Sequence, residues 1–103
     1  MPVSVEQTGR PQGHGYVAAR VDTPNPFLGD GSAVRGHEFH YSRITRGADT
    51  VPTALAINRG VGIGGGRDGI QVAKTLACYT HIHAAGVPEW APAMVRAASG
   101  GQR

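Results

Sequence analysis

The sequence predicts an α/β fold in which about five strands precede one C-terminal helix. Gly occurs 16 times and Pro 7 times among 103 residues, which disfavours a helix bundle or coiled coil and favours short strands joined by turns. Apolar residues make up 40% of the chain and charged residues 17%, a balance that supports a core and is unlike a typical disordered chain. A chain of this length holds one domain at most.

The charge pattern and the single Cys exclude several classes of protein. Ten Lys and Arg residues against seven Asp and Glu give a net charge of +3. The basic residues are scattered, which indicates a solvated surface rather than a nucleic-acid site, with an anionic small molecule or a partner chain as the alternative. One Cys excludes an internal disulfide framework and a Cys-rich zinc site. Without a long apolar segment or a secretory signal, we expect a cytoplasmic protein with no membrane partner.

The strands are expected where short β-branched or aromatic runs lie between turn residues. Residues 1–15 and 22–32 are rich in turn residues and are expected to be loops. Gly36 is a candidate bulge inside the second strand. The expected strands cover residues 16–21, 33–44, 53–58, 70–74 and 76–83.

The C-terminal helix is expected over residues 88–98. Pro88 stands near its start and Gly100 follows its end, an arrangement that is typical of helix boundaries. One helix covers only part of one sheet face, so the chain resembles a piece of a larger layered domain. The buried side of the helix is expected to hold Met94, Val95 and Ala98, together with Trp90 or Ala91.

The segment 76–83 carries the most chemistry. In a strand, His81 and His83 share a face with Tyr79, while Cys78 points the opposite way. Two His at this spacing can chelate a metal ion, transfer protons near neutral pH, or simply be solvated, and the spacing alone leaves all three open. Because Cys78 is expected to point away from His81, a buried structural thiol is favoured over a nucleophile.

A second cluster occupies the strand expected over residues 33–44. Glu38 and His40 share one face, and His37, Phe39 and Tyr41 share the other. A Glu beside a His can orient the imidazole and raise its basicity. The alternative is a salt-bridged pair on the surface.

The glycine-rich run at residues 60–66 formally contains the G-x-G-x-x-G pattern. We reject a dinucleotide site, because that pattern opens a helix and here the dipeptide Asp68-Gly69 predicts a hairpin turn that leads into a strand. The run is therefore expected to be a flexible turn, or a backbone that approaches a ligand closely.

Two longer motifs carry a resemblance to a known family. Residues 36–42 (GHEFHYS) and 79–83 (YTHIH) resemble the C-terminal motifs of cobyrinic acid a,c-diamide synthases. These are glutamine-dependent amidoligases with an N-terminal ATP-binding domain and a C-terminal class I glutaminase domain. The chain is most similar to their siroheme amidase branch, which is associated with dissimilatory sulfite reductase. The motifs at residues 11–16, 58–62, 65–69 and 86–91 carry the similarity to this branch, and the whole resemblance spans about residues 9–98.

The resemblance implies a fold and a site. The family's glutaminase domain is flavodoxin-like and three-layered, and residues 1–103 would be the C-terminal half of one such domain. His81 matches the catalytic His, the general base and acid for a Cys nucleophile. Glu38, His40, Tyr79 and His83 would support it, although His83 stands where many class I glutaminases carry a Glu.

The resemblance also implies what lies outside this chain. The family's Cys-Gly-Gly turn and phosphate-binding loop are not found in it, and ATP and Mg²⁺ are expected only in the full-length enzyme, with no cofactor or metal held here. Glutamine and a tetrapyrrole acceptor would bind through the missing regions. Alone, the chain is expected to be inactive as an amidotransferase. An exposed sheet edge or core face predicts self-association, or binding to the ATP-binding domain or a complementing chain.

Two other readings stay open at this stage. The chain could be a free-standing β-rich module that binds a ligand or metal ion through its His residues. It could also be a non-catalytic subunit that completes a split glutaminase. The residues for the first reading are His37, His40, His81 and His83.

Overall fold

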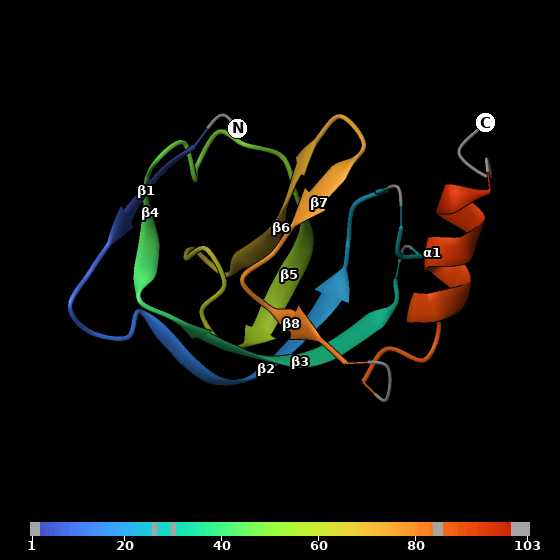
Figure 1. Ribbon diagram of the computed structural model, residues 1–103, viewed down its shortest axis with the longest axis horizontal. Helices are drawn as coiled ribbons and strands as arrows, with labels where there is room; N and C mark the ends of the chain where they lie inside the picture. Colours follow the sequence, from blue (N-terminus) through green and yellow to red (C-terminus); the bar gives the residue numbers. More distant parts are fainter. Residues whose placement is uncertain (1–2, 26, 30, 84–85, 100–103) are drawn as a thin grey trace.

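A computed structural model of the chain describes residues 3–25, 27–29, 31–83 and 86–99. In these ranges eight strands precede one C-terminal helix (Figure 1). The elements are β1 (Ser4–Gln7), β2 (Gly13–Val21), β3 (Ala33–His40), β4 (Ser42–Arg46), β5 (Thr53–Arg59), β6 (Arg67–Val72), β7 (Thr75–Ala77), β8 (His81–Ile82) and α1 (Trp90–Ala98).

Six strands form one curved sheet in the order β7-β6-β5-β2-β3-β8, and β1 pairs with β4 in a second, two-stranded sheet. Neighbouring strands in both sheets are antiparallel. The sheet-dominated architecture with a C-terminal helix is confirmed. The flavodoxin-like, three-layer arrangement needs parallel strands with helices on both faces, and it stays an expectation about the family's whole domain.

The core lies on one face of the central strand β2. Val17, Ala19 and Val21 are buried. Tyr16, which precedes Val17, and Arg20, which precedes Val21, are exposed. This alternation arises because successive side chains of a strand point to opposite faces. Each buried Val or Leu stabilises the fold by about 1.5–3 kcal/mol relative to an exposed side chain. The rest of this cluster is Leu28, Val34, Leu55 and Val87.

The expected number of about five strands is wrong, for identifiable reasons. The segment at 33–44 divides at Tyr41 into β3 and β4, and β1 forms in residues expected to be a loop. The segment at 76–83 divides into β7 and β8, because the amides of Tyr79 and Thr80 donate to the carboxylate of Asp68 instead of a neighbouring strand. The strands at 16–21, 53–58 and 70–74 are confirmed, with shifted ends.

Two local expectations about glycine are corrected. Gly36 is not a bulge, because the pairing of β2 with β3 runs through it without a shift. A Cβ at this position would overlap the carbonyl oxygen of His81, so Gly36 permits the close approach of β8. Asp68 and Gly69 do not form the hairpin turn, since both lie inside β6. The turn follows at Ala73, the one non-Gly residue of the described ranges with positive φ, at 52°.

The helix α1 begins at Trp90, two residues later than expected, and Gly100 lies outside the described residues. Its expected buried side is wrong, because the small residue Ala93 is the buried one. Met94 and Val95 are exposed by 41% and 66%. The helix lies at one end of the curved sheet rather than across it, so only a narrow strip is covered (Figure 1). None of the described helical residues form a segment long and apolar enough to cross a membrane.

Candidate functional site

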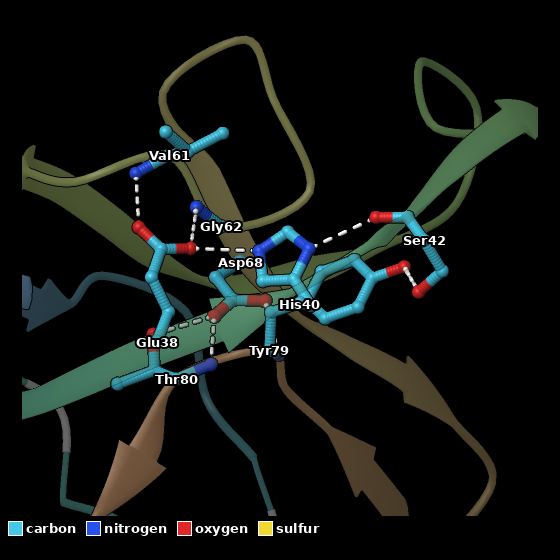
Figure 2. A network of polar contacts seen from close by, with 8 residues as sticks. All are labelled: Glu38, His40, Ser42, Val61, Gly62, Asp68, Tyr79 and Thr80. Carbon is cyan, nitrogen blue, oxygen red and sulfur yellow. Dashed lines mark hydrogen bonds and ion pairs between the residues drawn. The ribbon is translucent and has the colours of Figure 1, made fainter. Parts of the chain in front are cut away.

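A buried carboxylate, Glu38, organises one side of the candidate site (Figure 2). The residue is 2% exposed. Its Oε2 accepts a hydrogen bond from the amide of Val61 at 2.6 Å, and its Oε1 accepts one from the amide of Gly62 at 3.0 Å. His40 Nε2 lies 2.9 Å from the same Oε1. The prediction that Glu38 and His40 share a face is confirmed. The alternative of a salt-bridged pair on the surface is wrong, because Glu38 is buried.

The ring of His40 is fixed on both of its nitrogens and on one face. Nδ1 lies 2.9 Å from the carbonyl oxygen of Ser42, which can only accept, so Nδ1 carries a proton. Nε2 lies against the Glu38 carboxylate, so both ring nitrogens have a hydrogen-bond partner. Tyr79 stacks on the ring, and its hydroxyl lies 2.8 Å from Ser42 Oγ. Glu38, His40 and Tyr79 thus form one network.

A second buried carboxylate, Asp68 of β6, holds the segment before His81. Asp68 is 0% exposed. Its Oδ1 accepts from the Tyr79 amide at 3.1 Å, and its Oδ2 accepts from the Thr80 amide at 2.9 Å and from Thr80 Oγ1 at 2.6 Å. Sequence reasoning missed this role and treated Asp68 as a turn residue. One sequence signal points to burial of Asp68. It stands two residues before the apolar residue Ile70, and residues at this spacing share one face of a strand.

His81 lies outside this network, on the exposed side of the sheet. In β8 it stands opposite His37 of β3, with ring centroids 4.9 Å apart and planes at 38°. His83 is also exposed. Since His37 and His40 point to opposite faces of β3, the proposed four-His module is divided. Among the described residues, no group of three His, Cys, Asp or Glu side chains is arranged to hold a metal ion.

An open hollow of about 390 Å³ lies beside His81. Its lining is mostly apolar and comes from the loop after β2, from β7 and β8, and from α1. The lining residues are Phe27, Leu28, Leu76, Cys78, Thr80, His81, Ile82, Trp90 and Met94.

The glycine run is an anchored turn. Gly60 and Gly62 adopt φ of 119° and 60°, the region that favours glycine. Strand β6 follows the run, which confirms that it opens no helix. The amides of Val61 and Gly62 already donate to Glu38, so a protein carboxylate occupies the nest that a phosphate would otherwise fill.

Cys78 is unsuited to nucleophilic attack. Burial raises the pKa of its thiol to about 12, and the negative charge of Asp68 adds to the effect. A nucleophilic Cys needs the opposite, a lowered pKa and an electropositive, accessible surrounding. Cys78 packs against the hydrophobic core, as expected for a structural thiol.

Comparison with known proteins places the chain in a family. Residues 1–88 match the model of the CobB/CobQ-like glutamine amidotransferase domain. The chain belongs to this family. No solved structure matches it. The resemblance to cobyrinic acid a,c-diamide synthases is thereby confirmed at the level of the family.

Curated relatives extend well beyond this chain. A cobyrinate a,c-diamide synthase of Magnetococcus marinus is 35% identical over 96 residues, which is 93% of this chain and 21% of the relative. That of Methanothermobacter thermautotrophicus is 44% identical over 95 residues, 92% of this chain and 21% of the relative. That of Halobacterium salinarum is 39% identical over 83 residues, which is 81% of this chain and 19% of the relative. The chain therefore spans about a fifth of the length of these relatives.

Proposed function

We propose that this chain supplies the catalytic His of a glutamine-hydrolysing site, His81, to a glutamine-dependent amidoligase. One observation carries the assignment. The amides of Tyr79 and Thr80, directly before His81, are bonded to buried Asp68, while the imidazole of His81 is exposed. A general base needs a fixed backbone and an accessible ring, and this segment has both. Membership of the glutamine amidotransferase family supports the assignment.

The proposed chemistry has two steps. A Cys thiolate attacks the side-chain amide carbon of glutamine after His81 takes the thiol proton, and His81 returns that proton to the departing ammonia. Water, deprotonated by His81, then cleaves the thioester and releases glutamate. Because Cys78 is buried with a pKa of about 12, the nucleophile is proposed to come from residues outside this chain. The hollow beside His81 is mostly apolar. This exposed apolar surface supports the proposal that another protein segment covers it.

The acceptor is proposed to be an acetate carboxylate of a tetrapyrrole. ATP, with Mg²⁺, would convert the carboxylate to an acyl phosphate, and ammonia would displace the phosphate to give the amide. These partners, and glutamine, are proposed to bind largely outside the described residues. The names of the relatives favour cobyrinate. The motifs at residues 11–16, 58–62, 65–69 and 86–91 favour siroheme, through their resemblance to the siroheme amidase branch.

The supporting residues are proposed to act through the backbone. The polar atoms of Glu38, His40 and Tyr79 bond within the network and not toward the hollow, so they would keep the glycine turn and the His81 segment in place. His83 is exposed beyond His81 and is proposed to lie near the same site.

Glutamine hydrolysis tests the role of His81. The chain is produced together with the Cys-bearing remainder of a glutaminase domain, in one polypeptide or as two chains, and ammonia release is measured. His81→Ala should lower the rate by about 10²–10⁴-fold, whereas His14→Ala, an exposed His on β2, should not. Unchanged hydrolysis by His81→Ala overturns the proposal.

Two further arms test the source of the nucleophile and the acceptor. The purified chain alone should release no ammonia from glutamine. If the chain alone releases ammonia and His81→Ala abolishes this release, the proposal that the nucleophile lies outside the chain is overturned. With the complete amidoligase, ATP, Mg²⁺ and glutamine, mass spectrometry of cobyrinate and siroheme identifies which one gains an amide, and amidation of neither overturns the proposed acceptor class.

A further inference from the structure

We propose that Asp68 is the positioning residue of His81, and that its carboxylate, rather than the sheet, fixes where the imidazole stands. The inference rests on the proposed function only in treating His81 as the reacting side chain. Asp68 lies in the interior and touches no reacting atom. Its effect on His81 passes through the peptide groups of Tyr79 and Thr80, which directly precede His81.

The sheet itself holds His81 weakly. Strand β8 has two residues, and its ladder to β3 consists of Gly36 with Ile82 and His37 with His81. Immediately before this ladder, the two oxygens of Asp68 accept two amide bonds and one hydroxyl bond, from Tyr79 and Thr80. Hydrogen bonds to an ionised acceptor are about twice as strong as neutral ones. The carboxylate therefore carries most of the local restraint.

Asp68 is itself held in a closed circuit of contacts (Figure 2). A Cβ on Gly62 would lie 2.8 Å from the Asp68 Cβ, so the glycine turn packs directly against it. The Gly62 amide bonds Glu38, and Glu38 bonds His40. His40 stacks on Tyr79, whose amide returns to Asp68. A displacement of Asp68 relative to Tyr79, two residues before His81, would have to break one of these contacts.

The donors around Asp68 require a carboxylate. Three N–H and O–H groups point at two oxygens, and an amide side chain offers one oxygen and an NH2 group that can only donate. Asp68→Asn therefore turns a donor toward the Tyr79 or Thr80 amide and releases that peptide. His81, one residue later, follows the released peptide away from His37.

Nuclear magnetic resonance of the isotope-labelled chain tests this directly. The readouts are the cross-peak between the His81 and His37 rings and the amide shifts of Tyr79 and Thr80, recorded where each variant is folded. Asp68→Asn should weaken the cross-peak at least severalfold and move both amides. Thr80→Val, which removes the hydroxyl bond alone, should move them less and in the same direction. Val21→Ala, which leaves a cavity in the core at β2, is the control for a general loss of stability.

Each outcome decides the proposal. If Asp68→Asn is folded and leaves the ring cross-peak and both amides as they were, the proposal is overturned. If Asp68→Asn does not fold, Thr80→Val decides, and unchanged signals in that variant overturn it. Equal shifts in Val21→Ala would show a general loosening and would also overturn it.

Kinetics of the complete glutaminase add a second readout. Asp68→Asn should lower kcat by about 10²-fold, since misplacement by about 1 Å has that effect, and should change the KM for glutamine much less. A changed KM with unchanged kcat would contradict positioning. If His81→Ala proves to have full activity, the proposed function fails while the magnetic resonance result for Asp68 stands by itself.

Discussion

His40 stacks face to face on Tyr79, with ring centroids 3.7 Å apart and planes 9° from parallel. Ser42 completes the contact, because its carbonyl accepts from His40 Nδ1 and its hydroxyl bonds the hydroxyl of Tyr79. The two rings and the serine therefore form a rigid unit between β3 and the segment before β8. This unit lies beside buried Glu38, which binds the same imidazole.

Removal of the His40 imidazole should destabilise the fold strongly. His40→Ala deletes the stack on Tyr79 and leaves the Glu38 carboxylate buried with its two amide donors alone. Removing one hydrogen-bond partner of a buried polar group in this way costs about 1–3 kcal/mol, and the lost stack on Tyr79 adds to that cost. Urea unfolding measures the loss, with Phe39→Ala, on the exposed face of β3, as the control. A loss no greater than that of Phe39→Ala would contradict the burial argument.

The two glycines Gly62 and Gly65 should respond differently to the same substitution. Both adopt positive φ, at 60° and 65°. A Cβ at Gly65 meets nothing within 4 Å, whereas a Cβ at Gly62 would overlap the carbonyl oxygen of Arg67. Gly65→Ala should cost about 1–2 kcal/mol for the backbone conformation alone, and Gly62→Ala should cost distinctly more. Thermal unfolding of the two variants compares them, and equal losses would refute the crowding at Gly62.

The ion pair of Asp22 with Arg67 should weaken as the pH falls. Hydrogen bonds from Arg67, at 2.6 and 2.8 Å, hold the pKa of the Asp22 carboxyl below its ordinary value of 3.8. The unfolded chain therefore takes up the proton first, so the stabilisation is complete above pH 3.8 and is lost as the pH falls through the lower, folded pKa. Because both side chains are about one-third exposed, the effect should stay within about 1 kcal/mol.

Asp22→Asn makes that dependence measurable. Urea midpoints of the wild type and the variant should differ at pH 5 and converge toward pH 2.5. Asp49→Asn, at an exposed Asp outside the strands, is the control. A difference between wild type and Asp22→Asn that is the same at both pH values would argue against the shifted pKa.

Cys78 should resist alkylation while the chain is folded. With a thiol pKa of about 12, about one thiol in ten thousand is ionised at pH 8, and the thiolate is the form that reacts. Mass spectrometry after treatment with iodoacetamide should show little modification of the folded chain and rapid modification in guanidinium chloride. Equal rates in the two conditions would show that the thiol is accessible.

Part of this arrangement could be predicted from the residues alone. Alternation along β3 placed Glu38 and His40 together, because the period of a strand is a local property. Alternation could not place Cys78 in the same way, because the strand expected over residues 76–83 is interrupted between Ala77 and His81. The outcome for α1 was different. The large residues Met94 and Val95 suggested a buried face, but the helix packs through Ala93, and which face packs depends on where the sheet ends.

The role of Asp68 had no comparable signal. Its partners include the backbone amides of Tyr79 and Thr80, 11 and 12 residues later, and an amide carries no residue-type signature. The local sequence, with glycine on both sides of Arg67 and Asp68, is typical of a turn. The pairing of β6 with both β5 and β7 turns that residue inward, and this pairing is a long-range property.

The lengths of the two outermost strands of the large sheet decide how another chain can associate with it. Strands β7 and β8 have three and two residues, so an incoming strand would gain only a few backbone hydrogen bonds at either border. Short borders of this kind protect natural sheets against strand addition and amyloid-like growth. A complementing polypeptide would therefore dock on the side-chain surfaces around β8 and α1, where recognition depends on shape and chemistry and not on the backbone.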